Sequence, residues 1–538
     1  MKRRYISLSA EQAPWSRSGG LAEVAGSLPE ALALHWREHR DHNSGEEVTT
    51  ECISVSPLYP CVWREVARRG ARLLPGQTLS LEPVSDSSAQ LWTLDGAEGG
   101  EHSEVTHVFV DLPWAFDRPQ LYGPPGQSYP DNPARFASFC LAVLRWIDLI
   151  GEDTTGEETI VHCHDWQSAF LPIFHQRGWG NSQIKTLFTI HNLQHQGRCE
   201  AYWVTKLGLS WSDFHMNYLE HWGQMNPLKA ALLSVDEVTT VSPSYAEEVT
   251  TSAFSCGLDA FLRANDIQIT GILNGLDVEA WSPHSSAHLS AHLPPSPSDQ
   301  ELVAWKRALK TEVAPRLYPI PQEGENESKN ENESESKVLG APLAVLISRL
   351  DQQKGIDLLI NSAVTWLDQG GKLFILGSGD PKLEVAVLTL ATRYPHRCEV
   401  KIGFHLGLAH QLFAAADLCL IPSKFEPCGL TQMQSMRYGA LPLATPVGGL
   451  RDTISTLNRE GLLHDETRGN GFLSSEVSAS ALSQTLESAY TLWSDQAGWA
   501  AARRRALNTS WSWQESAKSW SDLISRLSSK EKRVERLK

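Results

Sequence analysis

The stretch Ser423–Ile454, SKFEPCGLTQMQSMRYGALPLATPVGGLRDTI, follows the apolar run Leu418–Ile421, which predicts a buried strand. The polar loop after that run is interrupted by Pro427 and Gly429 and then opens into a helical pattern. A glycine turn at a helix N-terminus exposes unpaired backbone N–H groups beside the positive end of the helix dipole, and both features favour a bound phosphate. Glu426 stands just before this turn, where its carboxylate can accept hydrogen bonds from sugar or ribose hydroxyls. The segment therefore indicates an α/β unit that handles a phosphorylated sugar or a nucleotide sugar.

Short β-branched runs alternate with longer segments of helical period throughout the chain, and this alternation predicts parallel α/β sheets. In open sheets of this kind the ligand lies beyond the carboxyl ends of the strands, and most polar motifs of this chain stand at such ends. The helical segments include Leu21–His35, Pro133–Ile150 and Ile356–Trp366. The predicted strands are Arg4–Leu8, Cys52–Ser56, Val105–Asp111, Thr159–Cys163, Thr186–Ile190 and Glu237–Val241 in the first half, and Ala344–Ile347, Lys372–Leu376, Glu399–Ile402 and Leu418–Ile421 in the second.

The length of 538 residues exceeds what one hydrophobic core supports and favours two domains. We place their boundary within Leu273–Pro283, which gives a first domain of residues 1–275 and a second of residues 276–515, followed by a C-terminal helix at 516–538. The segment 322–337 is acidic and of low complexity, so we expect a disordered surface insert there.

The charge balance disfavours two classes of partner. With 47 basic and 63 acidic side chains the net charge is −16, which opposes non-specific binding of nucleic acid or of an anionic membrane. The nine cysteines are odd in number and widely spaced, which favours reduced thiols. The N-terminus lacks an apolar core of signal-peptide length, and no apolar run approaches the length of a membrane span. We therefore expect a cytoplasmic protein, and the sequence leaves its oligomeric state open.

Two cations follow the strand predicted at Ala344–Ile347. Arg349 and Lys354 stand in the motif SRLDQQKG, where a guanidinium and an ammonium can converge on a diphosphate and stabilise the charge that builds on a leaving phosphate. A solvated surface pair is the alternative, and composition alone favours it. The glycine turn after Glu426, in the same half of the chain, makes a diphosphate site the preferred interpretation.

A second glycine turn, SRSGGL at Ser16–Leu21, enters the first predicted helix. It lacks the spacing of a dinucleotide or P-loop motif. We expect its backbone at Gly19 and Gly20 to approach a ligand closely, with Arg17 as a cation over phosphate. A plain helix N-terminus explains the same residues equally well.

The motif HCHDW at His162–Trp166 ends another predicted strand and invites a metal interpretation. No second cluster with ligand spacing accompanies it, and the chain contains no Asp-x-Asp pair, so we favour a metal-independent enzyme. Hydrogen bonds from His164 and Asp165 to a sugar are the preferred interpretation, and a structural role is preferred for His162.

Taken in order along almost the whole chain, these motifs resemble those of glycosyltransferase family 5, the bacterial glycogen synthases and plant starch synthases. The stretches that carry the resemblance include SRSGGLAEVAGSLPEAL, DNPARF, HCHDWQ, FTIHNLQHQG, ILNGLDVEAWSP, SRLDQQKGIDLL, PSKFEPCGLTQM, VGGLRDT and SWSWQESAKSW. The resemblance implies a GT-B fold, in which two Rossmann-like domains face each other across a deep cleft. The glucan acceptor would bind residues 1–275 and the nucleotide-sugar donor residues 276–515, and the last helix would cross back to the first domain.

The resemblance also implies an activity and its residues. Glucose would pass from ADP-glucose to the non-reducing end of an α-1,4-glucan, with retention of anomeric configuration and without a cofactor or metal ion. The catalytic residues implied are His164, Arg349, Lys354 and Glu426. The donor would bind Arg17, Gly19, Gly20, Asn274, Phe404, Cys428, Gly429 and Leu430, and further residues of the cleft would be Glu23, Asp131 and Asp165.

The chain departs from the usual family motifs at several of these positions. This chain has Arg17 where Lys is usual, Glu23 where Asp is usual, and Phe404 where Tyr is usual. It also has Thr445 in place of Arg and Val447 in place of Thr. Two alternatives therefore stay open. One is a GT-B transferase that uses UDP-glucose or another acceptor, and the other is a catalytically weak homologue that binds glucan or regulates a partner.

Overall fold

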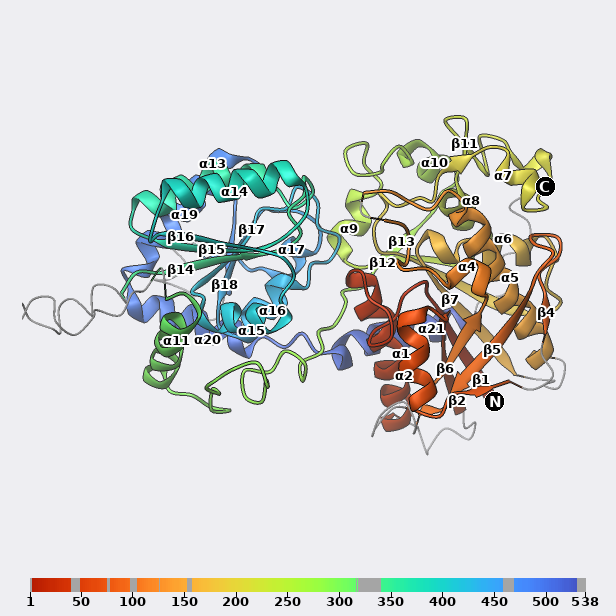
Figure 1. Cartoon of the computed structure of the whole chain (residues 1–538), viewed down its shortest axis with the longest axis horizontal. Helices are drawn as coiled ribbons and strands as arrows, with labels where there is room; N and C mark the ends of the chain where they lie inside the picture. The colour runs from red at the N-terminus through yellow and green to blue at the C-terminus, as the bar shows by residue number, and fades with distance from the viewer. Residues whose placement is uncertain are drawn as a thin grey trace, which may run out of the picture. The chain divides into compact units, whose positions relative to one another are not determined.

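The computed structural model describes residues 2–39, 49–74, 78–96, 104–124, 126–151, 157–315, 317, 340–457 and 469–529 (Figure 1). The insert predicted at 322–337 lies outside these residues. The chain divides into two compact units. Unit 1 contains the chain up to Gly275 together with the C-terminal segment from Trp513, and unit 2 contains Leu276–Ser512. The chain therefore leaves unit 1 once and returns to it at the end.

Unit 1 is built on a ten-stranded sheet with the order β13-β12-β8-β7-β1-β2-β6-β5-β3, in which β4 pairs with β5. All pairs from β13 to β6 are parallel, whereas β5 is antiparallel to its neighbours. Strands β1, β7 and β8 are buried along nearly their full length, as expected for parallel strands covered on both faces. The strands are β1 Lys2–Leu8, β2 Thr49–Pro57, β3 Arg72–Leu73, β4 Leu79–Ser80, β5 Ser88–Leu94, β6 Val105–Asp111, β7 Glu158–His164, β8 Ile184–Ile190, β12 Glu237–Thr240 and β13 Ile269–Gly271.

A second, three-stranded antiparallel sheet of unit 1 has the order β10-β11-β9 and follows β8 in the chain. Its strands are β9 Cys199–Glu200, β10 Glu220–His221 and β11 Gln224–Met225. The helices of unit 1 are α1 Gly20–Glu38, α2 Pro60–Arg68, α4 Pro113–Phe116, α5 Asn132–Gly151, α6 Phe170–Gln176, α7 Trp203–Lys206, α8 Pro227–Ser234, α9 Pro243–Glu248, α10 Asp259–Ala264 and α21 Trp513–Ser529.

The C-terminal helix α21 completes the core of unit 1. Its buried face carries Trp513 and Trp520, which belong to the same hydrophobic cluster as Tyr5 of β1. Trp36 of α1 donates a hydrogen bond of 2.8 Å from its indole nitrogen to Ser521. Helix α21 is therefore part of unit 1 although unit 2 precedes it in the chain.

Unit 2 contains a six-stranded, wholly parallel sheet with the order β16-β15-β14-β17-β18-β19. Both units thus have the parallel α/β architecture that the sequence predicts. No helix within the described ranges is long and apolar enough to cross a membrane. The strands are β14 Leu343–Ile347, β15 Lys372–Gly377, β16 Cys398–Ile402, β17 Leu418–Ile421, β18 Leu441–Ala444 and β19 Phe472–Leu473, and the helices are α11 Asp299–Val313, α13 Ile356–Asp368, α14 Pro381–Arg393, α15 Leu406–Ala415, α16 Thr431–Arg437, α17 Gly448–Thr453, α19 Ala479–Trp493 and α20 Gln496–Asn508.

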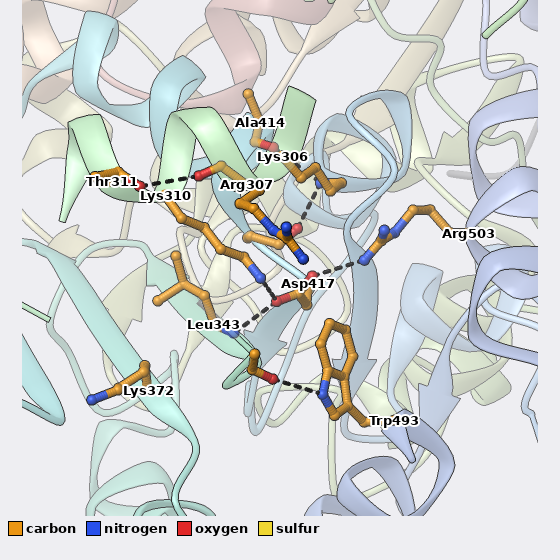
Figure 2. Close-up of polar contacts among 12 residues, drawn as sticks. Lys306, Arg307, Lys310, Thr311, Leu343, Lys372, Ala414, Asp417, Trp493 and Arg503 are labelled. Atoms are coloured by element: carbon orange, nitrogen blue, oxygen red, sulfur yellow. Dashed lines mark hydrogen bonds and ion pairs between the residues drawn. The ribbon is translucent and has the colours of Figure 1, made fainter. Parts of the chain in front are cut away.

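Asp417, directly before β17, is the centre of a buried charge cluster in unit 2 (Figure 2). Its Oδ2 lies 2.5 Å from Lys310 Nζ of α11 and accepts a hydrogen bond of 2.8 Å from the N–H of Leu343. Its Oδ1 accepts a hydrogen bond of 2.7 Å from Arg503 of α20. Burial disfavours the charged carboxylate, but Lys310 and Arg503 outweigh burial and hold the pKa of Asp417 below its usual value. One carboxylate thereby joins two helices to the sheet.

A further cation lies in this cluster. Lys306 is 1% exposed and donates from Nζ to the carbonyl oxygens of Ala414 and Ala416, at 3.1 and 2.6 Å. Burial and the nearby Arg503 lower its pKa well below the ordinary value. The amine therefore carries less charge than a surface lysine, which limits the repulsion among the three basic groups around Asp417.

Replacement of Asp417 tests how much this cluster stabilises unit 2. Asp417→Asn leaves Lys310 and Arg503 buried without a negative partner. We expect a loss of about 3–5 kcal/mol in the free energy of unfolding, measured by urea titration with tryptophan fluorescence. As a control, Asp299→Asn removes an exposed pair with Arg504 and should leave stability close to the wild-type value. Equal stability of the two variants would contradict the role assigned to Asp417.

Candidate active site

The polar motifs gather where the strand order of each sheet reverses. In unit 1, β2 and β6 lie on one side of β1, and β7, β8 and β12 lie on the other. In unit 2, β15 and β16 lie on one side of β14, and β17 and β18 lie on the other. Loops that leave the carboxyl ends of such neighbouring strands diverge, and ligands of open α/β sheets bind there. The two switch points are therefore β1/β7 in unit 1 and β14/β17 in unit 2.

At the switch point of unit 2 the structure brings Lys354 and Glu426 together from two loops. Lys354 Nζ lies 2.6 Å from Glu426 Oε2, and Ser423 Oγ donates a hydrogen bond of 2.9 Å to the same oxygen. The side chains of the pair are 19% and 9% exposed, so water screens their attraction weakly. Arg349 stands in the loop of Lys354, with its guanidinium 3.1 Å from Asp351. Lys354 and Glu426, which belong to separate sequence motifs, thus lie in contact at the β14/β17 switch point.

Glycines allow the two loops to approach each other. Gly355 has φ 66°, and a Cβ atom there would lie 1.8 Å from the carbonyl oxygen of Pro422. A Cβ atom at Gly448, which has φ 43°, would lie 2.1 Å from the carbonyl oxygen of Glu426. The N–H of Gly449 donates to that same oxygen at 3.1 Å. A larger residue at Gly355 or Gly448 would therefore displace the loops that carry the ion pair.

The turn after Glu426 is fixed by one side chain. Gln432 of α16 donates from Nε2 to the carbonyl oxygens of Cys428 and Gly429, at 3.0 and 2.7 Å. Gly429 has φ 71°, which glycine adopts without strain, and Cys428 is buried. Leu430 is the N-cap residue of α16. The proposed contact of this turn with a donor phosphate stays a prediction.

Two departures from the family motifs lie in the interior of unit 2. Thr445 is fully buried, and its hydroxyl donates to the carbonyl oxygen of Ser423 in the loop of Glu426. Val447 is 2% exposed and belongs to the hydrophobic core of unit 2. Thr445 thus holds the loop of Glu426 by a buried hydrogen bond, whereas Val447 contributes to the core.

At the switch point of unit 1, His164 lies in a buried chain of hydrogen bonds. Its Nε2 is 3.1 Å from Ser7 Oγ, and its Nδ1 is 2.9 Å from His191 Nε2. Burial lowers the pKa of His164 well below its ordinary value, and the neighbouring His162 adds to this effect. The ring is therefore neutral at physiological pH. Because His164 is fully buried with both nitrogens bonded, a contact with sugar requires that one of these bonds be exchanged.

Asp165 follows His164 with φ 56° and accepts the His191 N–H at 2.7 Å through Oδ1. Burial raises its pKa to about 7, the N–H donors of His191 and Asn192 oppose this, and the charge of Glu11 raises it further. Because Leu8 pairs with Cys163, the loops after β1 and β7 begin side by side. Within the described residues, no three His, Cys, Asp or Glu side chains form a group suited to a metal ion.

His162 has a different environment. Its Nδ1 is 2.6 Å from the Tyr5 hydroxyl, its Nε2 is 2.5 Å from Thr189 Oγ1, and its ring centroid is 5.0 Å from that of Trp520. The ring is fully buried. These contacts agree with a structural role.

Glu11 is a residue of this site that the sequence reasoning missed. It is 3% exposed and accepts hydrogen bonds from both the hydroxyl and the N–H of Ser18, in the glycine turn before α1. Burial raises its pKa. Its position in the loop after β1, the carboxyl end of a central strand, was the signal that could have identified it.

The glycine turn itself is open. Gly19 is the N-cap residue of α1 and Gly20 its first residue, and a Cβ atom at either would meet nothing within 4 Å. Arg17 pairs with Glu23 at 3.0 Å, with 44% and 32% of the side chains exposed. The guanidinium of Arg17 is thus accessible at the β1/β7 switch point, although contact of this turn with a donor stays a prediction.

Three predicted residues lie apart from these groups in the sequence. Asp131 accepts hydrogen bonds from Arg118, one of 2.8 Å, and this pairing outweighs burial and lowers its pKa. Asn274 is 6% exposed, and its buried Oδ1 has no hydrogen-bond partner. Phe404 is 80% exposed between β16 and α15 and offers a free aromatic face.

Comparison with known proteins finds similarity over nearly the whole chain. Residues 5–264 match the family model of the starch synthase catalytic domain, and residues 327–505 match that of glycosyl transferases group 1. Glycogen synthase of Anaeromyxobacter dehalogenans is 36% identical over 96% of this chain and 97% of its own length. Glycogen synthase of Paracoccus denitrificans is 34% identical, with 97% and 98% covered. The catalytic domain of starch synthase IV from Arabidopsis thaliana, solved with ADP and acarbose, superposes with a TM-score of 0.78 at 28% identity over 98% of this chain and 99% of that one.

The raised pKa of Asp165 predicts a pH-dependent stability. The carboxyl group titrates near 3.8 when unfolded and near 7 when folded, so between these values the folded protein binds more protons and its stability falls as the pH rises. Asp165→Asn keeps an acceptor for the His191 N–H but cannot ionise. We expect the stability of this variant relative to wild type to increase between about pH 5 and about pH 7 in urea unfolding and to level off above that range.

Asp131→Asn serves as the control for this pH dependence. The pKa of Asp131 is lowered, so its contribution to stability is already complete above the ordinary pKa of a carboxyl group. The difference between this variant and wild type should therefore stay constant over the same pH range. A constant difference for Asp165→Asn as well would contradict the assigned pKa.

Proposed function

The chain belongs to the family of glycogen and starch synthases, and we propose that it transfers glucose from ADP-glucose to the non-reducing end of an α-1,4-glucan with retention of anomeric configuration. Extension of a glucan is the activity of the family. The adenine base of the donor, the stereochemistry and the roles of individual residues are the parts that we propose.

The ion pair of Lys354 and Glu426 at the β14/β17 switch point carries the proposal. A donor diphosphate bound there would lie beside the cations of Lys354 and Arg349, which would stabilise the charge that develops as the diphosphate leaves. Glu426 would accept hydrogen bonds from hydroxyls of the donor glucose or ribose. The ADP in the related starch synthase IV supports an adenosine diphosphate as the leaving group.

The chemistry needs no protein nucleophile. The bond between glucose C1 and the phosphate oxygen breaks while the acceptor hydroxyl forms a new bond to C1 on the same face. The released phosphate oxygen accepts the proton of that hydroxyl, so charge and atoms balance. The protein's part is to align the two substrates and to stabilise the diphosphate. We assign the donor to unit 2, with the exposed ring of Phe404 against adenine, and the glucan to unit 1.

A comparison of donors tests the proposal directly. Purified protein offered glycogen with ADP-glucose or UDP-glucose, in the presence of EDTA, should incorporate labelled glucose from ADP-glucose at the higher kcat/KM. Incorporation from UDP-glucose alone would refute the assigned base and leave the reaction type in place. Binding of glycogen with no transfer from either donor would favour a glucan-binding homologue.

Substitutions at the ion pair test the residue roles. Lys354→Ala and Glu426→Ala should each lower kcat/KM by about a hundred- to a thousandfold, because each removes a group that acts on the developing charge or on the sugar. Lys424→Ala is the matched control. Lys424 lies in the loop of Glu426 and pairs with Asp357 at 2.7 Å, and 37% of its side chain is exposed. Its activity should stay near wild type. Near-normal activity of the Lys354 or Glu426 variant, with an unchanged circular dichroism spectrum, would remove that residue from the mechanism.

A further inference from the structure

Exposed aromatic side chains collect on the segment of unit 1 between β8 and α8. Tyr202, Trp211 and Trp222 are 54%, 54% and 69% exposed. The segment contains α7 and the three-stranded sheet β10-β11-β9, and Figure 1 shows α7 and β11 (yellow) together at one end of unit 1. None of these residues belongs to the site described above. Three aromatic side chains exposed on one short segment are candidates for a binding function.

The indole of Trp222 is held in place although most of it is exposed. Trp222 and Gly223, with φ of 54° and 78°, form the two-residue turn between β10 and β11, and a positive φ is uncommon for a bulky residue. The Trp222 ring stacks on His221 at 4.4 Å between centroids. A Cβ atom at Gly257 would lie 2.5 Å from the indole, so only glycine leaves room for it. A bulky residue at a positive φ, with its ring fixed and exposed, is typical of a functional position.

The hairpin is tied to the switch point of unit 1. Gly197, two residues before β9, packs so closely that a Cβ atom would lie 2.3 Å from the ring of Trp166 in the HCHDW motif. Gln196 accepts a hydrogen bond of 2.7 Å from Asn226, which follows β11, and donates one of 3.1 Å to the carbonyl oxygen of Cys256, next to Gly257. The surface that carries Trp222 is therefore braced against the loop of Asp165.

We propose that Trp222, with Trp211 and Tyr202, binds the pyranose rings of the glucan acceptor by stacking. A pyranose ring in an α-1,4-glucan has an apolar face of C–H groups and a rim of hydroxyls, and an exposed indole face matches the apolar face. Such contacts are weakly directional, so a growing chain can shift along the surface after each addition. The inference rests on the proposed function in that it takes a glucan as the acceptor bound by unit 1.

Equilibrium binding without a donor tests this surface. Trp222→Asn removes the indole and suits a positive φ, and Trp222→Tyr keeps an aromatic face. By isothermal titration calorimetry with maltoheptaose, Kd should rise about five- to tenfold for the Asn variant and stay within about twofold for the Tyr variant. Trp63→Ala is the control, because Trp63 is also exposed, at 40%, but lies on α2 against Trp92. Its Kd should be unchanged.

The result separates this proposal from the proposed transferase activity. Unchanged maltoheptaose affinity of Trp222→Asn, in a protein that still elongates glycogen, would overturn the stacking surface and leave the activity intact. Weaker binding in that variant supports the surface even if no donor supports transfer. In active protein the Trp222→Asn variant should have a higher KM for glycogen, while kcat and the KM for the donor stay unchanged. A fall of kcat at saturating glycogen, with the KM for glycogen unchanged, would contradict a binding role.

Discussion

Contact between main-chain atoms of the segments that follow β14, β17 and β18 is the constraint on which the candidate active site depends. Gly355 lies against the carbonyl oxygen of Pro422, and Gly448 lies against that of Glu426, at distances that exclude any Cβ atom. The positions of Lys354 and Glu426 therefore depend on backbone packing, to which the side-chain hydrogen bonds of Gln432 and Thr445 add. Charged groups held in this way need little reorganisation when charge develops on a bound substrate, which is the condition for electrostatic catalysis.

The strand β17 connects this site to the buried charge cluster of unit 2. Asp417 precedes the strand, and Pro422 and Ser423 follow it. At the amino end a carboxylate with basic partners from α11 and α20 anchors the sheet, and at the carboxyl end the chain enters the loop of Glu426. The charge cluster that stabilises unit 2 and the loop that carries Glu426 thus lie at opposite ends of one short strand. The four residues of the strand are completely or nearly completely buried, so a shift of Asp417 is transmitted to the site through close packing.

Much of this arrangement could be predicted from the sequence because it depends on local patterns. The ten predicted strands all appear in the structure, since β-branched runs between turn signals are a short-range property. Arg349, Lys354 and Glu426 were recognisable because they follow strands of a parallel sheet. Asp417 and Glu11 were not, because each is defined by partners distant in the sequence or by burial that no local pattern reveals. Complete burial of His164 was hidden for the same reason.

The discontinuity of unit 1 has a consequence for biosynthesis. Its sheet is made before unit 2, whereas Trp520, which lies on the ring of His162, and Trp513, which lies on Gly275, are made after unit 2. All of unit 2 emerges from the ribosome in between. A nascent chain therefore holds an incomplete first core, with its α21-facing surface uncovered, while the second unit is already able to fold. Closure of that core requires the segment from Trp513, so it follows the synthesis of unit 2.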